Sequence, residues 1–207
     1  MREYIKTPKS EVTDELEKDI NDMISAIEVG AQRTRNIVKS LRQFSREDTV
    51  HYVEVDIITG LESTFGLLSN KLKQGIYIEK DFEKKEMPIF CFPGQLNQVF
   101  MNILLNAIQA VEGAGLIKVG VVEQAKNIII SIADNGIGIP DDKKQKIFEP
   151  FYTTKDGQEG TGLGLSITFD IIKKHKGSIE VKDNDPKGTI FIISLPKRAE
   201  RLIRSMA

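Results

Sequence analysis

The sequence is poor in cysteine and contains no tryptophan: Cys91 is the only cysteine among 207 residues. A single cysteine cannot form a disulfide within the chain, so the sequence lacks the disulfide framework of small secreted domains. The neighbours of Cys91 are Phe90 and Phe92, which indicates a thiol packed in a core. We therefore expect a reducing compartment, with the cytoplasm as the default.

The sequence also lacks a long apolar run and an excess of charge of either sign. No run approaches the roughly 18–20 apolar residues that span a bilayer, and no charged-then-apolar leader opens the chain. The chain has 29 Lys and Arg residues and 30 Asp and Glu residues, for a net charge of −1. We therefore expect no membrane segment in this chain and no nucleic acid partner.

An alternating four-three spacing of apolar and small residues marks the N-terminal part of the chain. The spaced positions are Leu16, Ile20, Met23, Ile27, Gly30, Thr34, Ile37, Leu41 and Phe44. This spacing predicts one long helix from about Ser10 or Thr13 to about Arg46. A lone helix cannot bury such a stripe, so we expect a homodimer formed through this helix. The alternative is a helix folded back on its own domain, because Gly30 and Thr34 weaken the middle of the stripe.

A different pattern begins after Glu47, and it predicts a domain boundary that divides the chain into a helical segment at 1–48 and a globular domain at 49–207. Helices are expected at about 57–73, 94–111 and 163–175, an extended piece at 88–92, and strands at about 76–82, 115–123, 127–134, 177–183 and 188–195. Helices gathered on one face of a mostly antiparallel, mixed sheet describe an α+β fold, a two-layer α/β sandwich.

Polar side chains recur along one edge of the apolar helix at 94–111. They are Gln98, Asn102, Asn106 and Gln109, spaced three or four residues apart. A carboxamide oxygen is a hard, neutral ligand that suits Mg²⁺, which takes much of its shell from water and nucleotide phosphates. By themselves, such amides are equally explained as hydrogen-bond partners of neighbouring loops.

Asp134 ends an apolar strand and is followed by Gly136 and Gly138. A carboxylate at a strand end can accept a hydrogen bond from the exocyclic amine of adenine, and glycines let the backbone pass close to the base. Ile139 can pack on the ring. The tetrapeptide alone is also a common turn.

A second glycine motif leads directly into the helix at 163–175. It consists of Gly160, Thr161, Gly162, Leu163, Gly164 and Leu165. Free amides at a helix start can receive phosphate oxygens. The spacing matches neither a dinucleotide fingerprint nor a P-loop. Before it, Phe148 is expected to anchor a mobile lid at 140–162 and Lys155 to reach a phosphate, although a solvated loop explains the same charges.

These motifs, in this order and spacing, resemble the catalytic core of sensor histidine kinases, in the Bergerat-type ATPase superfamily shared with gyrase, mismatch-repair ATPases and heat-shock chaperones. Residues 31–46 also resemble the second dimerisation helix of nitrogen-regulator-type sensor kinases. The resemblance implies a Bergerat-type ATP-binding fold, with Asn106 as the Mg²⁺ ligand, Asn102 near the phosphates and Thr189 completing the adenine contact. It implies an ATP site formed by Asn102, Asn106, Gln109, Asp134, Gly136, Gly138, Ile139, Phe148, Lys155, Gly160, Thr161, Gly162, Leu163, Gly164, Leu165 and Thr189, with Asn102, Asn106 and Lys155 as its catalytic residues.

Asn102 distinguishes between reaction classes. Hydrolases of this superfamily carry a glutamate four residues before the metal-binding asparagine, and that glutamate deprotonates water. An amide cannot act as a general base, so we expect a site that holds ATP for another nucleophile, as in histidine kinases. The alternatives are a nucleotide-gated binding module without phosphotransfer and a protein-serine kinase of the same fold.

The sequence contains two histidines, His51 and His175. Neither is followed by the acidic residue and downstream proline expected around a phosphoacceptor, and both are predicted to be surface residues. The resemblance therefore implies an acceptor histidine on a helix that is not part of this chain, with the receiver domain of a response regulator as the next partner. It is also compatible with the cytoplasmic part of a membrane-bound sensor.

Overall fold

A computed structural model describes residues 16–28, 30, 31, 34, 51–72, 75–154 and 161–198. These residues divide into two units. The larger unit contains residues 51–152 and 162–198, and the smaller one contains the described residues up to 34 together with 153, 154 and 161. The predicted domain boundary near residue 48 lies outside the described residues and stays a prediction.

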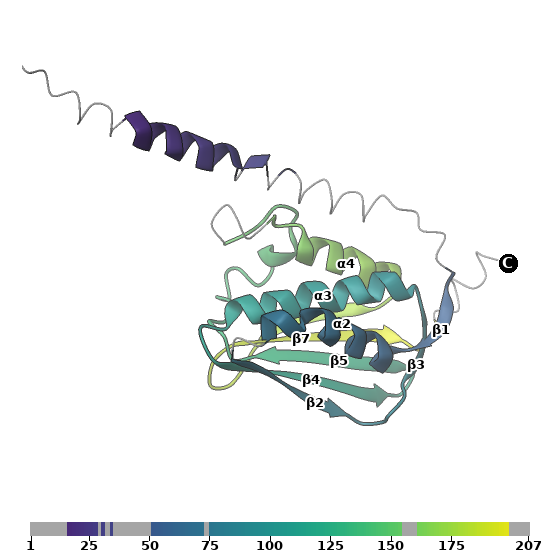
Figure 1. Cartoon of the computed structure of the whole chain (residues 1–207). Coiled ribbons are helices and arrows are strands. Elements are labelled where there is room, and N and C mark those ends of the chain that lie inside the picture. The colour runs from purple at the N-terminus through teal and green to yellow at the C-terminus, as the bar shows by residue number, and fades with distance from the viewer. Residues whose placement is uncertain are drawn as a thin grey trace, which may run out of the picture. The chain divides into compact units, whose positions relative to one another are not determined.

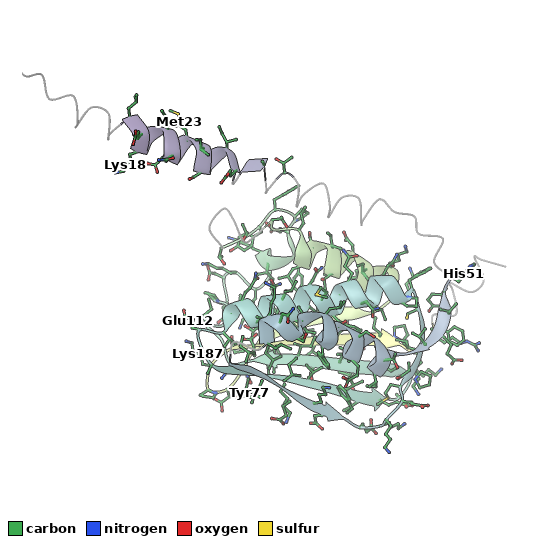
Figure 2. All side chains as sticks on the ribbon, in the orientation of Figure 1. Lys18, Met23, His51, Tyr77, Glu112 and Lys187 are labelled. Atoms are coloured by element: carbon green, nitrogen blue, oxygen red, sulfur yellow. The ribbon has the colours of Figure 1, made fainter. Side chains whose placement is uncertain are left out.

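Residues 16–28 of the smaller unit form a helix, on which Figure 2 labels Lys18 and Met23. Its apolar side chains are exposed, from 48% for Ile20 to 70% for Ile27. The Thr34 hydroxyl donates a hydrogen bond to the carbonyl of Gly30, over 2.9 Å. The predicted long helix is thus seen in part, while its expected ends at 10–15 and 35–46 lie outside the described residues.

The larger unit is built on a five-stranded sheet. Its strands are β2 (Ile76–Phe82), β4 (Gly115–Gln124), β5 (Asn127–Asp134), β7 (Thr189–Pro196) and β6 (Ser178–Asp183), in that spatial order. β2 pairs with β4 in parallel, and the other neighbours pair antiparallel. The predicted mixed, mostly antiparallel sheet is therefore confirmed. The extended piece predicted at 88–92 is β3 (Pro88–Cys91), which forms a separate antiparallel pair with β1 (Val53–Asp56). This pairing was not predicted.

Three helices cover one face of the five-stranded sheet: α2 (Ile57–Leu72), α3 (Pro93–Ala110) and α4 (Gly164–Lys174) (Figure 1). Burial alternates along β5, where Ile128, Ile130 and Ile132 are at most 1% exposed and the residues between them are half-buried. A strand that presents alternate residues to a core has one face packed and one more open. This arrangement confirms the predicted two-layer α/β sandwich.

Asp56 fixes the point where β1 turns into α2. Its carboxylate accepts hydrogen bonds from the backbone N–H groups of Ile58 and Thr59, as an N-cap does, and from that of Met87 over 2.7 Å. Burial opposes ionisation of this carboxyl, but the bonds from Met87, Thr59 and Ile58 together outweigh it and lower the pKa of Asp56.

Among the described residues, no helix is long and apolar enough to cross a membrane.

Candidate functional site

Asp134 is a buried carboxylate held by three segments of the chain. It ends β5 and is 2% exposed. Its Oδ1 accepts hydrogen bonds from the N–H groups of Gly136, over 2.9 Å, and Thr189, over 3.3 Å. Asn184 donates from Nδ2 to the backbone carbonyl of Asp134, over 2.8 Å. Burial raises the pKa of Asp134, while the bonds from Gly136 and Thr189 act in the opposite direction.

Glycines around Asp134 are required by close backbone approaches. A Cβ on Gly136 would collide with the backbone carbonyl of Ala110, at the end of α3. A Cβ on Gly188 would collide with the carbonyl of Asp134, and Gly188 also has φ = +121°. These positions therefore tolerate no side chain, and they bring the ends of α3, β5 and the turn before β7 together.

The polar edge of α3 contacts α4 near its middle and, at its end, the turn that follows β5. We call this turn, residues 134–139, the Asp134 turn. Near the middle of α3, Asn102 donates from Nδ2 to the carbonyl of Gly164, over 2.9 Å, and to the hydroxyl of Thr168, over 3.3 Å. At its end, the carbonyl of Ala110 accepts a hydrogen bond from the N–H of Ile137, over 3.0 Å. Asn106 lies on α3 between these two contacts and is half-buried.

Gly162 lies two residues before α4. Its carbonyl accepts a backbone hydrogen bond from the N–H of Phe151, over 2.8 Å. Gly162 has φ = +66°, and a Cβ there would collide with the backbone of Phe151. The ring of Phe148 packs against Phe169 of α4 with centroids 5.6 Å apart. Phe148 is therefore anchored on α4, as expected for the base of a lid.

The larger unit thus brings together the Asp134 turn, the polar edge of α3 and the first turn of α4. Leu163 is buried, Ile139, Gly138, Gly164 and Leu165 are half-buried, and Gln109 is exposed. Lys155 and Gly160 lie outside the described residues. Thr161 is half-buried and belongs to the smaller unit. The roles predicted for all of these residues stay predictions.

A cavity of about 370 Å³ lies away from these residues, between the starts of α2 and α3. It is lined by Val55, Asp56, Ile57, Thr59, Gly60, Ser63, Cys91, Pro93, Leu96, Asn97 and Phe100. Burial raises the pKa of the Cys91 thiol to about 12, so this cysteine is a packed, unreactive group, as the sequence indicated.

The prediction that His175 is a surface residue is wrong, because its side chain is 3% exposed. Nδ1 lies 2.8 Å from the carbonyl of Ile171, and Nε2 accepts a hydrogen bond from the N–H of Phe92, over 3.1 Å. Only the neutral tautomer with its hydrogen on Nδ1 satisfies both partners. The neighbouring lysines suggested exposure, but His175 follows Ile171 by one helical turn and shares its buried face.

Burial lowers the pKa of His175, and the charge of Lys174 adds to this effect. His51 is exposed, as predicted. Figure 2 shows His51 at the end of the larger unit opposite to Glu112 and Lys187. Glu112 follows the end of α3, whose Ala110 carbonyl binds Ile137, and Lys187 precedes Gly188, which contacts Asp134. Neither histidine therefore lies at the predicted site.

Sequence reasoning missed three residues that hold the site together: Thr168, Asn184 and Gly188. Asn184 and Gly188 lie in the segment before β7, where the glycine itself is a signal of a close backbone approach. No sequence signal marked Thr168, because a threonine inside a helix is ordinary until its partner on another helix is known.

A family model described as histidine kinase-, DNA gyrase B-, and HSP90-like ATPase matches residues 92–199, just over half of the chain. Sporulation kinase E of Bacillus subtilis (strain 168) is 36% identical over 169 residues, which are 81% of this chain and 23% of that protein. Sensor histidine kinase ZraS of Escherichia coli (strain K12) is 33% identical over 172 residues, 83% of this chain and 37% of ZraS. The chain spans well under half the length of either relative.

Among solved structures, the nucleotide-free catalytic domain of histidine kinase ThkA has a TM-score of 0.67 and 31% identity, over 71% of this chain and 96% of that one. ThkA in complex with response regulator protein TrrA has a TM-score of 0.71 and 28% identity, over 95% of this chain and 54% of that one. The resemblance in sequence is therefore matched by a resemblance in fold.

Proposed function

Because the chain belongs to the family of histidine kinase-, DNA gyrase B- and HSP90-like ATPases, we propose that it is the ATP-binding kinase part of a two-component sensor histidine kinase. The observation that carries this proposal is the buried, oriented carboxylate of Asp134 beside the amide-bearing edge of α3. This carboxylate is held by backbone N–H groups, and Gly136 and Gly188 lie next to it. Such a carboxylate can accept a hydrogen bond from the amine of a flat base.

At the adenine end, Asp134 accepts a hydrogen bond from the exocyclic amine of the base. The strand pairing of β5 with β7 sets Thr189 opposite Asp134, so this threonine completes the polar contact. Gly136 lets the backbone pass close to the end of α3, Gly138 lets it pass close beside the base, and Ile139 packs on the ring. These roles make the site selective for adenine over a base that presents a carbonyl at the same position.

At the phosphate end, Asn106 supplies a neutral oxygen ligand for Mg²⁺, and the first amides of α4 receive phosphate oxygens. When bound, Mg²⁺ neutralises part of the phosphate charge. Lys155, Gly160 and Thr161 are assigned to the same end from the motif that they form. Phe148, anchored on Phe169, holds the base of the segment that covers the nucleotide.

The chemistry that this site supports is transfer of the γ-phosphoryl group to an incoming histidine. Asn102 carries an amide, which cannot deprotonate water, so the site favours retention of ATP over its hydrolysis. Both ring nitrogens of His175 are engaged in the core, and His51 lies at the other end of the unit. The acceptor histidine is therefore assigned to a helix outside this chain.

From the phosphohistidine, the phosphoryl group passes to an aspartate of a response regulator receiver domain. The complex of ThkA with a response regulator supports this class of partner. The exposed apolar stripe of residues 16–28 supports a homodimer formed through the N-terminal helix. The cytoplasm, where ATP and such regulators occur, is the proposed compartment.

The test is to add a separate acceptor-histidine domain and labelled ATP with Mg²⁺ to the chain. We expect an acid-labile phosphoprotein, lost in Asn106→Ala and kept in Asn97→Ala, which changes an exposed asparagine on the same helix. Bound ATP without transfer to any histidine would instead identify a nucleotide-gated binding module. An acid-stable product would identify a protein-serine kinase.

A further inference from the structure

Three groups of α3 and α4 form a closed hydrogen-bonded cluster. Asn102 Nδ2 donates to the carbonyl of Gly164, over 2.9 Å, and to Oγ1 of Thr168, over 3.3 Å. The hydroxyl of Thr168 donates to the same Gly164 carbonyl, over 2.9 Å. Thr168 is 0% exposed and lies outside the glycine motif at 160–165.

The directions of these hydrogen bonds follow from the chemistry of the three groups. A carbonyl can only accept, so the Asn102 amide must turn its NH₂ group toward Gly164. The Thr168 hydroxyl uses its hydrogen on the same carbonyl, so its lone pair is what faces Nδ2. Nδ2 of Asn102 therefore donates toward two oxygens that lie on the same side of the amide, 2.9 Å from each other.

This assignment changes the role expected of Asn102. The NH₂ group of Asn102 is its only donor and is directed at Gly164 and Thr168, and a carboxamide oxygen does not bind an anion. We propose that Thr168 is a positioning residue that, together with Asn102, locks the first turn of α4 against α3. Asn102 then acts on the nucleotide through the position of α4. This inference rests on the proposed function.

The cluster of Asn102, Gly164 and Thr168 lies at the proposed phosphate-binding end of the site, where a small displacement has the largest effect on the nucleotide. Gly164 is the first residue of α4, directly after the Gly162 turn, and its helix start is the proposed phosphate-binding end. Asn106 follows Asn102 by one helical turn on α3, so the cluster sets the distance between the Mg²⁺ ligand and the phosphate-binding amides. A shift of about 1 Å between such groups is enough to impair a reaction strongly.

The test is the substitution Thr168→Val, which keeps the shape of the side chain and removes the hydroxyl. We expect its affinity for ATP with Mg²⁺ to fall about fivefold to tenfold, the usual effect of one buried hydrogen bond. Affinity for adenosine, which lacks phosphates, should stay within about twofold because the Asp134 end is untouched. Both are measured by competition against a fluorescent ATP analogue, and Thr168→Ser, which keeps the hydroxyl, should restore ATP binding.

Thr64 of α2 provides a matched control. It is 2% exposed, and its hydroxyl donates to the carbonyl of Gly60, four residues earlier, over 2.9 Å, as that of Thr168 does to Gly164. α2 carries none of the proposed site residues. Thr64→Val therefore makes the same chemical change in a buried helix and should leave the affinities for ATP and adenosine as in the wild type.

The outcomes separate the two proposals. Equal effects of Thr168→Val and Thr64→Val on ATP binding, or equal losses of ATP and adenosine binding in Thr168→Val, would overturn the positioning role while the ATP site stands. A wild-type chain that binds no nucleotide would overturn the proposed function and this inference together. If Thr168→Val does not fold, Thr168→Ser and Thr168→Ala are compared, and equal ATP affinity of these two also overturns the role.

Discussion

The carboxylate of Asp134, at the end of β5, accepts a hydrogen bond from the backbone N–H of Thr189, at the start of β7 and 55 residues later in the chain. The two residues are partners in the β5–β7 register. One of the two bonds that orient the carboxylate therefore comes from a paired strand, and groups held by regular elements are positioned more precisely than groups held by loops alone.

We predict that Asp134→Asn weakens ADP binding by about tenfold to a hundredfold, because a charged acceptor at the adenine amine is replaced by a neutral amide. Isothermal titration with ADP and Mg²⁺ measures the change. Asp81→Asn, which alters an exposed carboxylate on β2, serves as the control and should bind as the wild type does. Unchanged ADP binding by Asp134→Asn would remove this residue from the site.

His175 should make the stability of the domain depend on pH. Burial lowers its pKa in the folded state, so below the ordinary value of about 6.5 the unfolded chain binds more protons than the folded one. The free energy of unfolding should therefore fall from pH 7 to pH 5.5, by at most about 1.4 kcal/mol per pH unit for one proton. Urea unfolding across this pH range measures it.

His175→Gln removes the titrating group and should flatten this pH dependence, although the variant is less stable at pH 7. His51→Gln, which changes an exposed side chain, should keep the wild-type dependence. The same slope in His175→Gln as in the wild type would show that another group is responsible.

Gly162, two residues before α4, and Gly164, the first residue of α4, should respond differently to alanine. Gly162→Ala adds a Cβ that collides with the backbone of Phe151, at a positive φ that by itself costs about 1–2 kcal/mol. Gly164→Ala meets only ordinary contacts with Asn102, the nearest at 3.7 Å, and lies in a helix. We therefore expect a melting temperature several degrees lower for Gly162→Ala and little change for Gly164→Ala. Equal melting temperatures would contradict the assigned backbone conformation.

The apolar stripe of the N-terminal helix should control association. Ile20 and Ile27 are 48% and 70% exposed. Replacing both by Glu should convert a dimer into a monomer, because charges at seam positions oppose helix pairing. Sedimentation equilibrium measures the mass, and Lys18→Glu with Ser25→Glu, off the stripe, is the matched control. A wild-type chain that is already monomeric would refute the proposed dimer.

Much of the local structure could be predicted from the sequence. The strands at 76–82 and 127–134 were predicted with the bounds that the structure has. The helix predicted at 94–111 begins and ends one residue earlier in the structure, because Pro93 is accommodated in its first turn. Family and fold were predicted correctly as well, since the motifs depend on spacing along the chain. The likeness to nitrogen-regulator-type kinases stays a prediction.

The sequence by itself determined where helices and strands form and which residues carry amides, carboxylates and glycines, because periodicity and turn chemistry are local properties. Only the tertiary structure decided which of these groups meet. Asn102 donates a hydrogen bond to Gly164, 62 residues away in the sequence, and His175 accepts one from Phe92, 83 residues away. Such contacts arise when helices pack on a common sheet, and their partners have no fixed spacing along the chain. For that reason the burial of His175 and the partners of Asn102 were not visible in the sequence.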